Sequence, residues 1–234
     1  MKLIGLSRSG KLAKVDFYGC PLKCGYCTHR GQRNEDHELM EVLEFVSNPE
    51  VEEVYLGGAE PSIHKAAVTE MLERFQRMKK KVTLKTSGND PDFIQETLGK
   101  VNKYVVEVKC PLDDVSCNSR LTGLSEERTI RYLEALKRTL EILRGQNVLI
   151  WMRVIPGYLT EENIERVGEQ VEGVATEALL YQFMSNPEND APFEGIEEPS
   201  PEESYMVTLA RSLLKYVPRV MIQGQGFRNE FGSS

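Results

Sequence analysis

The sequence predicts an α/β fold, a partial (β/α)6 barrel of the TIM type with parallel strands. Strand-like and helix-like stretches alternate along the chain in about six β-α units, which is typical of a parallel sheet with right-handed crossovers. A closed eight-stranded barrel needs ~250 residues, whereas this chain has 234. We therefore expect an open or partial barrel, formed as a single domain over residues 1–234.

The strands are predicted from short apolar runs bounded by turn residues. They cover residues 15–18, 51–56, 82–86, 104–109, 147–155 and 178–183. The helices of the first half are predicted from apolar residues at helical spacing. One spans about 36–47, the next is expected to have Ser62 as its N-cap and to reach Met78, and 91–98 form a short helix.

In the second half of the chain, cap residues place the helices. Ser125 is expected to cap a helix that carries leucines as far as Leu143, and Thr160 is expected to open the next helix. The run Ser-Pro-Glu-Glu over 200–203 has the pattern of a capping box with proline at N1 and predicts the last helix. In folds of this class the functional site lies at the carboxyl ends of the strands.

The composition is that of an ordinary globular protein, with 40% hydrophobic and 28% charged residues. No apolar run approaches the ~20 residues of a membrane span and no secretory segment is visible, so we expect a cytoplasmic protein with no membrane partner. The formal charge of −7 argues against non-specific binding of nucleic acids. The last three residues, 232–234, are set aside as resembling a cloning remnant.

A cysteine cluster carries most of the functional information. Cys20, Cys24 and Cys27 have the spacing C-x3-C-x2-C and follow the first predicted strand. Three thiolates can hold a four-iron cluster while one iron stays without a protein ligand, and an open iron is a place for chemistry. An odd total of five cysteines fits a metal site in a reducing compartment better than a disulfide framework.

The alternative to an iron–sulfur cluster is zinc, with Cys110, Cys117 or His29 as a distant fourth ligand. Structural zinc sites usually use C-x2-C pairs, so the spacing favours the cluster. Cys110 and Cys117 are then expected to be ordinary thiols. The isolated His29, His37 and His64 are expected at the surface or in packing.

With Tyr26 before its last cysteine, the triple resembles the signature of the radical S-adenosylmethionine (SAM) enzymes. The resemblance implies a [4Fe-4S] cluster on Cys20, Cys24 and Cys27, held in a loop over 19–35, with SAM bound at the fourth iron. It also implies an oxidoreductase that cleaves SAM reductively to methionine and a 5′-deoxyadenosyl radical, which abstracts a hydrogen atom. Such chemistry needs no general base, and none is assigned.

Motifs at two other strand ends extend the resemblance. The run Gly-Ala-Glu-Pro over 58–61 resembles the Gly-Gly-Glu-Pro that holds the amino group of SAM, with Ala59 where the second glycine is usual. An alanine is compatible with that turn unless the position needs a positive φ. Ser87, in the run Thr-Ser-Gly, stands where activating enzymes have a Thr-Asn-Gly-like turn. The SAM contacts implied by the resemblance are Tyr26, Gly58, Ala59, Glu60, Ser87, Glu107, Lys109 and Arg153.

The fourth and fifth predicted strands supply the charged members of that set. The run Glu-Val-Lys over 107–109 resembles the Asp-x-Lys of relatives of pyruvate formate-lyase activating enzyme, and strand alternation puts Glu107 and Lys109 on one face. A carboxylate suits the ribose hydroxyls and an ammonium suits the carboxylate of SAM. A structural ion pair is the alternative. Arg153 is a second candidate for the SAM carboxylate, a solvent-facing arginine being the alternative, and Trp151 is expected in the core.

The runs over 108–113 and 120–123 resemble the loop after the fourth strand in small activating proteins of anaerobic ribonucleotide reductase, and the runs over 154–160 and 181–183 also fit them. The resemblance to radical SAM enzymes covers roughly residues 3–223. The resemblance to the activating proteins implies an enzyme that takes a hydrogen atom from a backbone glycine of a partner glycyl radical enzyme, with flavodoxin or ferredoxin as the electron donor. One alternative is a radical SAM enzyme that acts on a small molecule, a nucleoside or a peptide. A third hypothesis is a non-catalytic metal-binding or electron-transfer protein. The loops over 28–36 and 185–199 are expected to face the substrate.

Overall fold

The computed structural model describes residues 1–184 and 199–232, so most of the predicted loop over 185–199 lies outside the described residues. The strands are β1 (Lys2–Ser9), β2 (Leu12–Phe17), β3 (Glu35–Asp36), β4 (Glu53–Gly58), β5 (Lys81–Thr86), β6 (Lys103–Glu107), β7 (Val148–Val154), β8 (Glu177–Gln182), β9 (Arg219–Gly224) and β10 (Phe227–Gly232). The helices are α1 (Leu39–Ser47), α2 (Lys65–Arg77), α3 (Pro91–Thr97), α4 (Val115–Thr122), α5 (Glu126–Ile142), α6 (Glu161–Val171) and α7 (Glu203–Leu213), with a 3-10 turn η1 (Pro61–His64).

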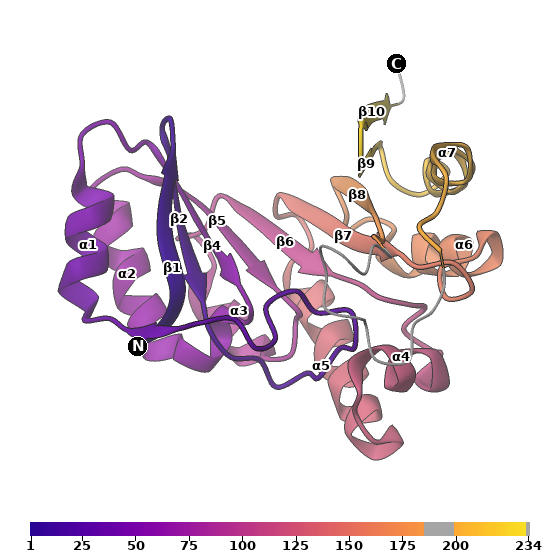
Figure 1. The fold of residues 1–234 in the computed structure, drawn as a ribbon, viewed down its shortest axis with the longest axis horizontal. Helices are drawn as coiled ribbons and strands as arrows, with labels where there is room; N and C mark the ends of the chain where they lie inside the picture. The colour runs from indigo at the N-terminus through magenta and orange to yellow at the C-terminus, as the bar shows by residue number, and fades with distance from the viewer. Residues whose placement is uncertain (185–198, 233–234) are drawn as a thin grey trace.

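In the described part of the chain the strands form one sheet in the order β10-β9-β8-β7-β6-β5-β4-β2-β1-β3. From β2 to β9 every neighbouring pair is parallel, while β1, β3 and β10 pair antiparallel at the two edges. Figure 1 shows the chain advancing across the sheet from the indigo strands β1 and β2 to the yellow strands β9 and β10. The sheet is mostly parallel and does not close, which confirms the predicted partial barrel.

The two faces of the parallel strands differ in burial. One face is fully buried and belongs to the same apolar core as the helices; its members include Val54, Leu56, Val82, Leu84, Val106, Ile150, Met152, Leu180 and Ile222. The opposite face is half-buried along β4, β5, β7 and β8, at Tyr55, Lys85, Trp151, Arg153 and Tyr181. Parallel sheets are usually covered on both faces. The half-buried face is therefore the one available to ligands.

The two edges of the sheet, the parallel strand β9 and the helix α4 were not predicted, although β9 alternates with Val220 and Ile222 buried. β1 and β10 are largely exposed and carry polar side chains on both faces, so neither shows an apolar alternation. The helix α4 has no apolar stripe, and its start depends on Asp114, whose side chain accepts a hydrogen bond from the Cys117 amide at 2.8 Å. None of the helices in the described ranges is long and apolar enough to cross a membrane.

Helix starts were predicted with mixed success. Ser125 and Thr160 are the N-caps of α5 and α6, and Thr160 accepts a hydrogen bond from the Asn163 amide. The cap predicted at Ser62 is wrong, because a 3-10 turn comes first and α2 begins at Lys65. The capping box predicted over 200–203 is also wrong, since α7 begins at Glu203 with Glu202 as its N-cap.

The end of β4 lies against the end of β2. Gly58 has φ +80°, and a Cβ at this position would lie 2.7 Å from the backbone nitrogen of Phe17. Directly after it, the Ala59 amide donates to the Phe17 carbonyl at 2.9 Å and the Glu60 amide donates to the Gly19 carbonyl at 3.0 Å. Ala59 itself is not among the positive-φ residues of the described chain, so the turn accepts its methyl group. These bonds fix the turn beside the start of the cysteine loop.

We expect Gly58→Ala to lower the free energy of unfolding by roughly 3 kcal/mol, because a left-handed backbone and an overpacked contact each cost ~1–3 kcal/mol. Gly10→Ala is the matched control: Gly10 has φ +57° but no heavy atom within 4 Å of its built Cβ, so only the backbone term of ~1 kcal/mol applies. Urea unfolding followed by circular dichroism measures both. Equal losses in the two variants would contradict the role given to the close approach to Phe17.

Candidate active site

The loop after β2 brings the clustered cysteines to the carboxyl ends of β2 and β4. Cys20, Cys24 and Cys27 are free thiols in the structure and line one cavity. The loop is held from its other side, where the Lys23 amide donates to the Thr122 carbonyl at the end of α4, at 2.8 Å. Burial raises the pKa of the Cys24 thiol to about 11, so this thiol is protonated at neutral pH and must release its proton when it binds a metal.

The cavity has a volume of about 70 Å³ and is open to solvent. Of the predicted SAM contacts, all except Glu60 and Ser87 lie on its wall. The lining residues are Cys20, Leu22, Cys24, Tyr26, Cys27, Thr28, His29, Gly58, Ala59, Lys85, Glu107, Lys109, Trp151 and Arg153. Residues from five separate segments of the sequence therefore meet at one end of the sheet.

Glu60 and Ser87 form a buried network outside this lining. Glu60 is fully buried, and its Oε2 accepts hydrogen bonds from both the amide and the hydroxyl of Ser87 at 2.7 Å. Its Oε1 accepts from the hydroxyl of Thr86 at 3.0 Å and from the amide of Ser62 at 3.2 Å. The carboxylate thus joins the turn after β4 to the turn after β5. A direct contact of Glu60 or Ser87 with SAM stays a prediction.

Glu107 is the centre of the polar contacts on the cavity wall. Its Oε1 accepts hydrogen bonds from Lys109 Nζ at 2.7 Å and from the hydroxyl of Tyr26 at 3.1 Å. Burial opposes ionisation of Glu107, but Lys109 and Lys85 outweigh it and hold the pKa of the carboxyl at about 2. Burial also opposes the charge of Lys109, yet Glu107 raises the pKa of Lys109 well above its usual range. The alternative of an ion pair is thus confirmed, while contact of these two residues with SAM stays a prediction.

Arg153 lies among aromatic rings on the same wall. Its guanidinium is 5.4 Å from the ring centre of Trp151, 5.5 Å from that of Tyr181 and 5.7 Å from that of Tyr26. Its Nε is buried without a hydrogen-bond partner among the described residues. The expectation that Trp151 belongs to the core is wrong, because its ring is half-buried and lines the cavity.

Two cavity residues were missed by the sequence analysis. Lys85 lies with its Nζ 4.3 Å from the ring centre of Trp151, and burial lowers the pKa of Lys85. Strand alternation would have found it, since Lys85 pairs with Val105, two residues before Glu107 on the same face of the sheet. His29 was expected at the surface or in packing, but it lines the cavity, and its Nδ1 is buried with no partner among the described atoms. Burial and Lys85 lower the pKa of His29.

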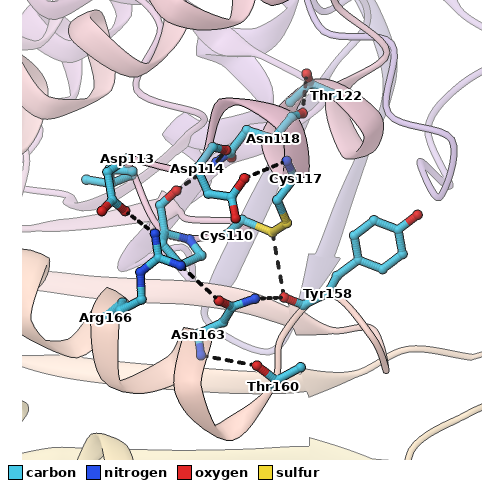
Figure 2. Close-up of a disulfide and its surroundings, with 12 residues drawn as sticks. Cys110, Asp113, Asp114, Cys117, Asn118, Thr122, Tyr158, Thr160, Asn163 and Arg166 are labelled. Carbon is cyan, nitrogen blue, oxygen red and sulfur yellow. Dashed lines mark hydrogen bonds and ion pairs between the residues drawn. A yellow bond between two sulfur atoms is a disulfide. The ribbon is translucent and has the colours of Figure 1, made fainter.

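Cys110 and Cys117 form a disulfide, so the expectation of two ordinary thiols is wrong (Figure 2). Cys110 comes directly after Lys109, and Cys117 lies in the first turn of α4. Their Cα atoms are 6.3 Å apart, within the range that a disulfide spans. The bond secures the backbone next to the cavity, and it leaves neither cysteine as a fourth zinc ligand.

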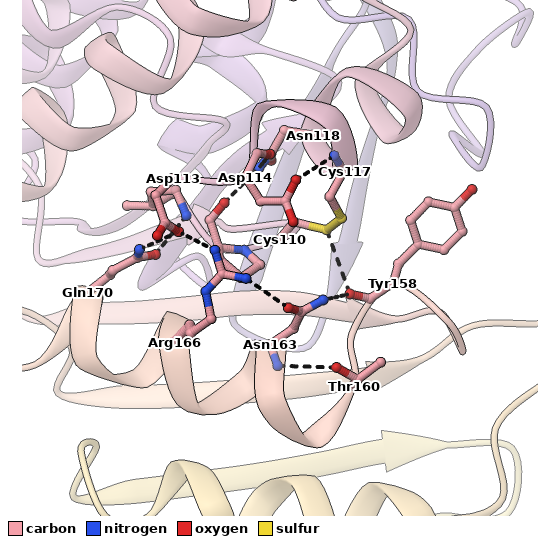
Figure 3. A network of polar contacts seen from close by, with 12 residues as sticks. Cys110, Asp113, Asp114, Cys117, Asn118, Tyr158, Thr160, Asn163, Arg166 and Gln170 are labelled. Carbon is pink, nitrogen blue, oxygen red and sulfur yellow. Dashed lines mark hydrogen bonds and ion pairs between the residues drawn. A yellow bond between two sulfur atoms is a disulfide. The ribbon is translucent and has the colours of Figure 1, made fainter.

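The same loop is fastened to α6 by a polar network (Figure 3). Asp113 accepts hydrogen bonds from Arg166 Nη2 at 3.0 Å and from Gln170 Nε2 at 2.8 Å, and the side chain of Asn163 donates to the Tyr158 carbonyl at 2.7 Å. The segment between Lys109 and α4 is therefore held from both sides.

The thiols and the turn fit an iron–sulfur cluster with an amino-acid-like ligand. In the described ranges no three His, Cys, Asp or Glu side chains converge to hold a single metal ion, whereas a four-iron cluster binds each cysteine through a different iron. Gly58 and Ala59 line the cavity beside the thiols, and the unpartnered Nε of Arg153 is a donor ready for an anion. The donor set therefore matches a cluster and a zwitterionic ligand.

Comparisons with known proteins agree with this reading. The family model described as "Radical SAM superfamily" matches residues 15–171. A protein of Methanocaldococcus jannaschii, provisionally named a glycyl-radical enzyme activating enzyme, is 26% identical over 90% of this chain and 88% of its own length. The 7-carboxy-7-deazaguanine synthase of Methanothermobacter thermautotrophicus is 25% identical over 66% of this chain and 68% of its own.

Among solved structures, a radical SAM methyltransferase from Sphaerobacter thermophilus has a similar fold. Its TM-score is 0.68 at 20% identity, and the match covers 94% of this chain and 68% of that one. At this identity the likeness concerns the fold, and it agrees with an open, mostly parallel sheet.

The lowered pKa of Glu107 predicts how the free energy of unfolding changes in acid. The carboxyl has a pKa of about 2 in the fold against an ordinary value of 4.5, so its contribution is fully present above about pH 4.5 and is lost as the pH falls towards 2. A shift of roughly two units corresponds to ~3 kcal/mol. Between pH 5 and pH 2.5, the unfolding free energy of the parent should therefore fall by up to about 3 kcal/mol more than that of Glu107→Gln.

Glu172→Gln, which changes an exposed carboxylate, is the control and should follow the parent at every pH. Chemical denaturation at a series of pH values gives the curves. A Glu107→Gln curve parallel to that of the parent would remove Glu107 as a source of acid sensitivity.

Proposed function

Because the chain belongs to the radical SAM superfamily, we propose that it is an activating enzyme, which takes a hydrogen atom from a backbone glycine of a partner glycyl radical enzyme. The family's cofactors are a [4Fe-4S] cluster and SAM. The observation that carries the proposal is one cavity lined by three free thiols, the Gly58 turn and the ion pair of Glu107 with Lys109. The activating subtype is supported by the provisionally named relative of M. jannaschii, which matches over most of both chains.

In this proposal Cys20, Cys24 and Cys27 hold the cluster. The backbone at Gly58 and Ala59, which lines the cavity beside the thiols, receives the amino group of SAM. When bound, the cluster and SAM together supply the one-electron chemistry of hydrogen-atom abstraction.

The charged residues of the wall then orient SAM. Oε1 of Glu107 is occupied by Lys109 and Tyr26, while its Oε2 has no partner among the described residues and can accept a ribose hydroxyl. Lys109 and Arg153 are the candidates for the carboxylate of SAM, and the unpartnered Nε of Arg153 favours this role. The half-buried rings of Trp151 and Tyr181 limit water near the reacting atoms.

A second candidate function is a radical SAM enzyme that acts on a small molecule. It is favoured by the stacked rings of Trp151 and Tyr181, whose centres are 5.7 Å apart on the cavity side of β7 and β8. The partial match to a 7-carboxy-7-deazaguanine synthase also points this way. As part of the leading proposal the protein works in the cytoplasm and receives its electron from flavodoxin or ferredoxin.

The first experiment is anaerobic electron paramagnetic resonance (EPR) of the reconstituted, reduced protein with and without SAM, together with an assay for 5′-deoxyadenosine. A four-iron signal that changes with SAM, and a stable glycyl doublet in a co-expressed partner, would support activation. Deuterium passing from a labelled metabolite into 5′-deoxyadenosine would instead support the small-molecule alternative. Stoichiometric zinc and no iron would overturn both.

Cys24→Ala should abolish formation of 5′-deoxyadenosine, because two thiols cannot retain the cluster. The described fold should persist, since Cys24 lies in a loop that other bonds hold in place, including that from Lys23 to Thr122. Iron content, product analysis and circular dichroism are the measurements. Cleavage of SAM at the parental rate in this variant would refute the assignment of the cluster.

Glu60→Ala should weaken SAM binding more than cluster binding, because it removes the acceptor that positions the turns after β4 and β5. Glu60→Gln, which keeps one acceptor oxygen, should lie between the parent and the alanine variant. Equilibrium binding of SAM is compared with iron content in all three proteins. Unchanged affinity for SAM in Glu60→Ala would remove this residue from the site.

A further inference from the structure

The cavity wall formed by β5, β6 and β7 carries more positive than negative charge. Lys85, Lys109 and Arg153 line it together with a single carboxylate, that of Glu107. Oε1 of Glu107 forms an ion pair with Nζ of Lys109 at 2.7 Å. Within residues 1–184 and 199–232, neither Lys85 nor Arg153 forms an ion pair. Two cations on this wall therefore have no direct ion-pair partner in the described chain, and Glu107 acts on Lys85 only without direct contact.

These two cations lie against the aromatic rings of Trp151 and Tyr181. Nζ of Lys85 is 4.3 Å from the ring centre of Trp151, and the guanidinium of Arg153 is 5.5 Å from that of Tyr181. The rings of Trp151 and Tyr181 are themselves stacked, with an interplanar angle of 28°. Arg153 pairs with Tyr181 in the register of β7 with β8, so the surface continues across the two strands. Aromatic faces orient a cation but do not neutralise it.

The carboxylate of SAM can pair with only one of the two cations. It carries a single carboxylate, for which Lys109 and Arg153 are the candidates under the proposed function. Lys85 comes from a different strand and has no role in that scheme. An ammonium removed from water without a partner costs free energy, which an anion brought to it would recover. The lowered pKa of Lys85, caused by burial, reflects the same cost.

We propose that Lys85, with Trp151 beneath it, recognises an anionic group of the substrate, a carboxylate or a phosphate. The inference rests on the proposed function in one respect, namely that SAM occupies the neighbouring part of the same cavity. Two sources can present this group: an acidic side chain next to the target glycine of a partner protein, or an acidic small molecule. The recognition chemistry is the same for both.

Trp151 makes the proposal measurable, because it is the only tryptophan of the chain. Its fluorescence is followed in the reconstituted, SAM-saturated protein during titration with inorganic phosphate and with two matched pairs of probes. One pair is a short peptide with aspartate next to glycine and its asparagine analogue. The other pair is a nucleoside 5′-monophosphate and the free nucleoside.

We expect phosphate to bind, and the anionic member of one pair to bind about tenfold or more tightly than its neutral analogue, as the loss of a charge-assisted hydrogen bond implies. A preference in the peptide pair identifies a protein partner, and one in the nucleotide pair identifies a small molecule. Lys85→Met should abolish the preference, whereas Lys85→Arg should retain it. Lys81→Met, on the same strand and face but exposed, is the control and should behave like the parent.

Three results would overturn the proposal: no preference in either pair, a preference that survives Lys85→Met, or a Lys85→Met variant whose affinity for SAM falls as much as its affinity for the anion. The last result would make Lys85 a ligand of SAM. Failure of the proposed function is seen separately, as a cluster whose EPR signal ignores SAM or as the absence of 5′-deoxyadenosine in the parent protein.

Discussion

The buried carboxylate of Glu60 accepts hydrogen bonds from Ser62, Thr86 and Ser87, which lie on the turns after two neighbouring strands. A charge without solvent contact is tolerated in a core only when such donors replace water. The amide of the same residue donates to the Gly19 carbonyl at the start of the cysteine loop. One residue thereby fixes the relative positions of β4, β5 and the thiols, and the remaining geometry of the site is built around this point.

The electrostatics of the site follow from the unequal faces of the sheet. The face packed on the helices is largely apolar, and the charged side chains of the central strands point to the other side. Glu107, Lys85 and Arg153 are concentrated there in partly desolvated surroundings, where charges interact more strongly than in water. The result is a firmly ionised carboxylate beside an excess of cations, which suits ligands that bring negative charge with them.

The sequence predicts those parts of the fold that leave a periodic signal. The central strands, the N-caps at Ser125 and Thr160, and the gathering of the cysteines with Gly58, Glu107 and Arg153 all follow from local patterns and from the rule that strand ends meet. The polar edge strands leave no such signal. Nor do contacts made in three dimensions, which place Lys85 over Trp151, bury His29 and join Cys110 to Cys117.

The open sheet affects how the reactants of the proposed reaction are shielded from solvent. A closed barrel surrounds its reactants by itself, whereas here the far side of the chamber has no strands between β3 and β10 to complete it in the described chain. In the proposed reaction, a substrate bound at this open side would itself complete the enclosure of the cavity. Substrate selectivity and exclusion of water would then have the same origin. A molecule of the wrong shape would leave the cavity open to water, and the radical would be quenched before it reached the substrate.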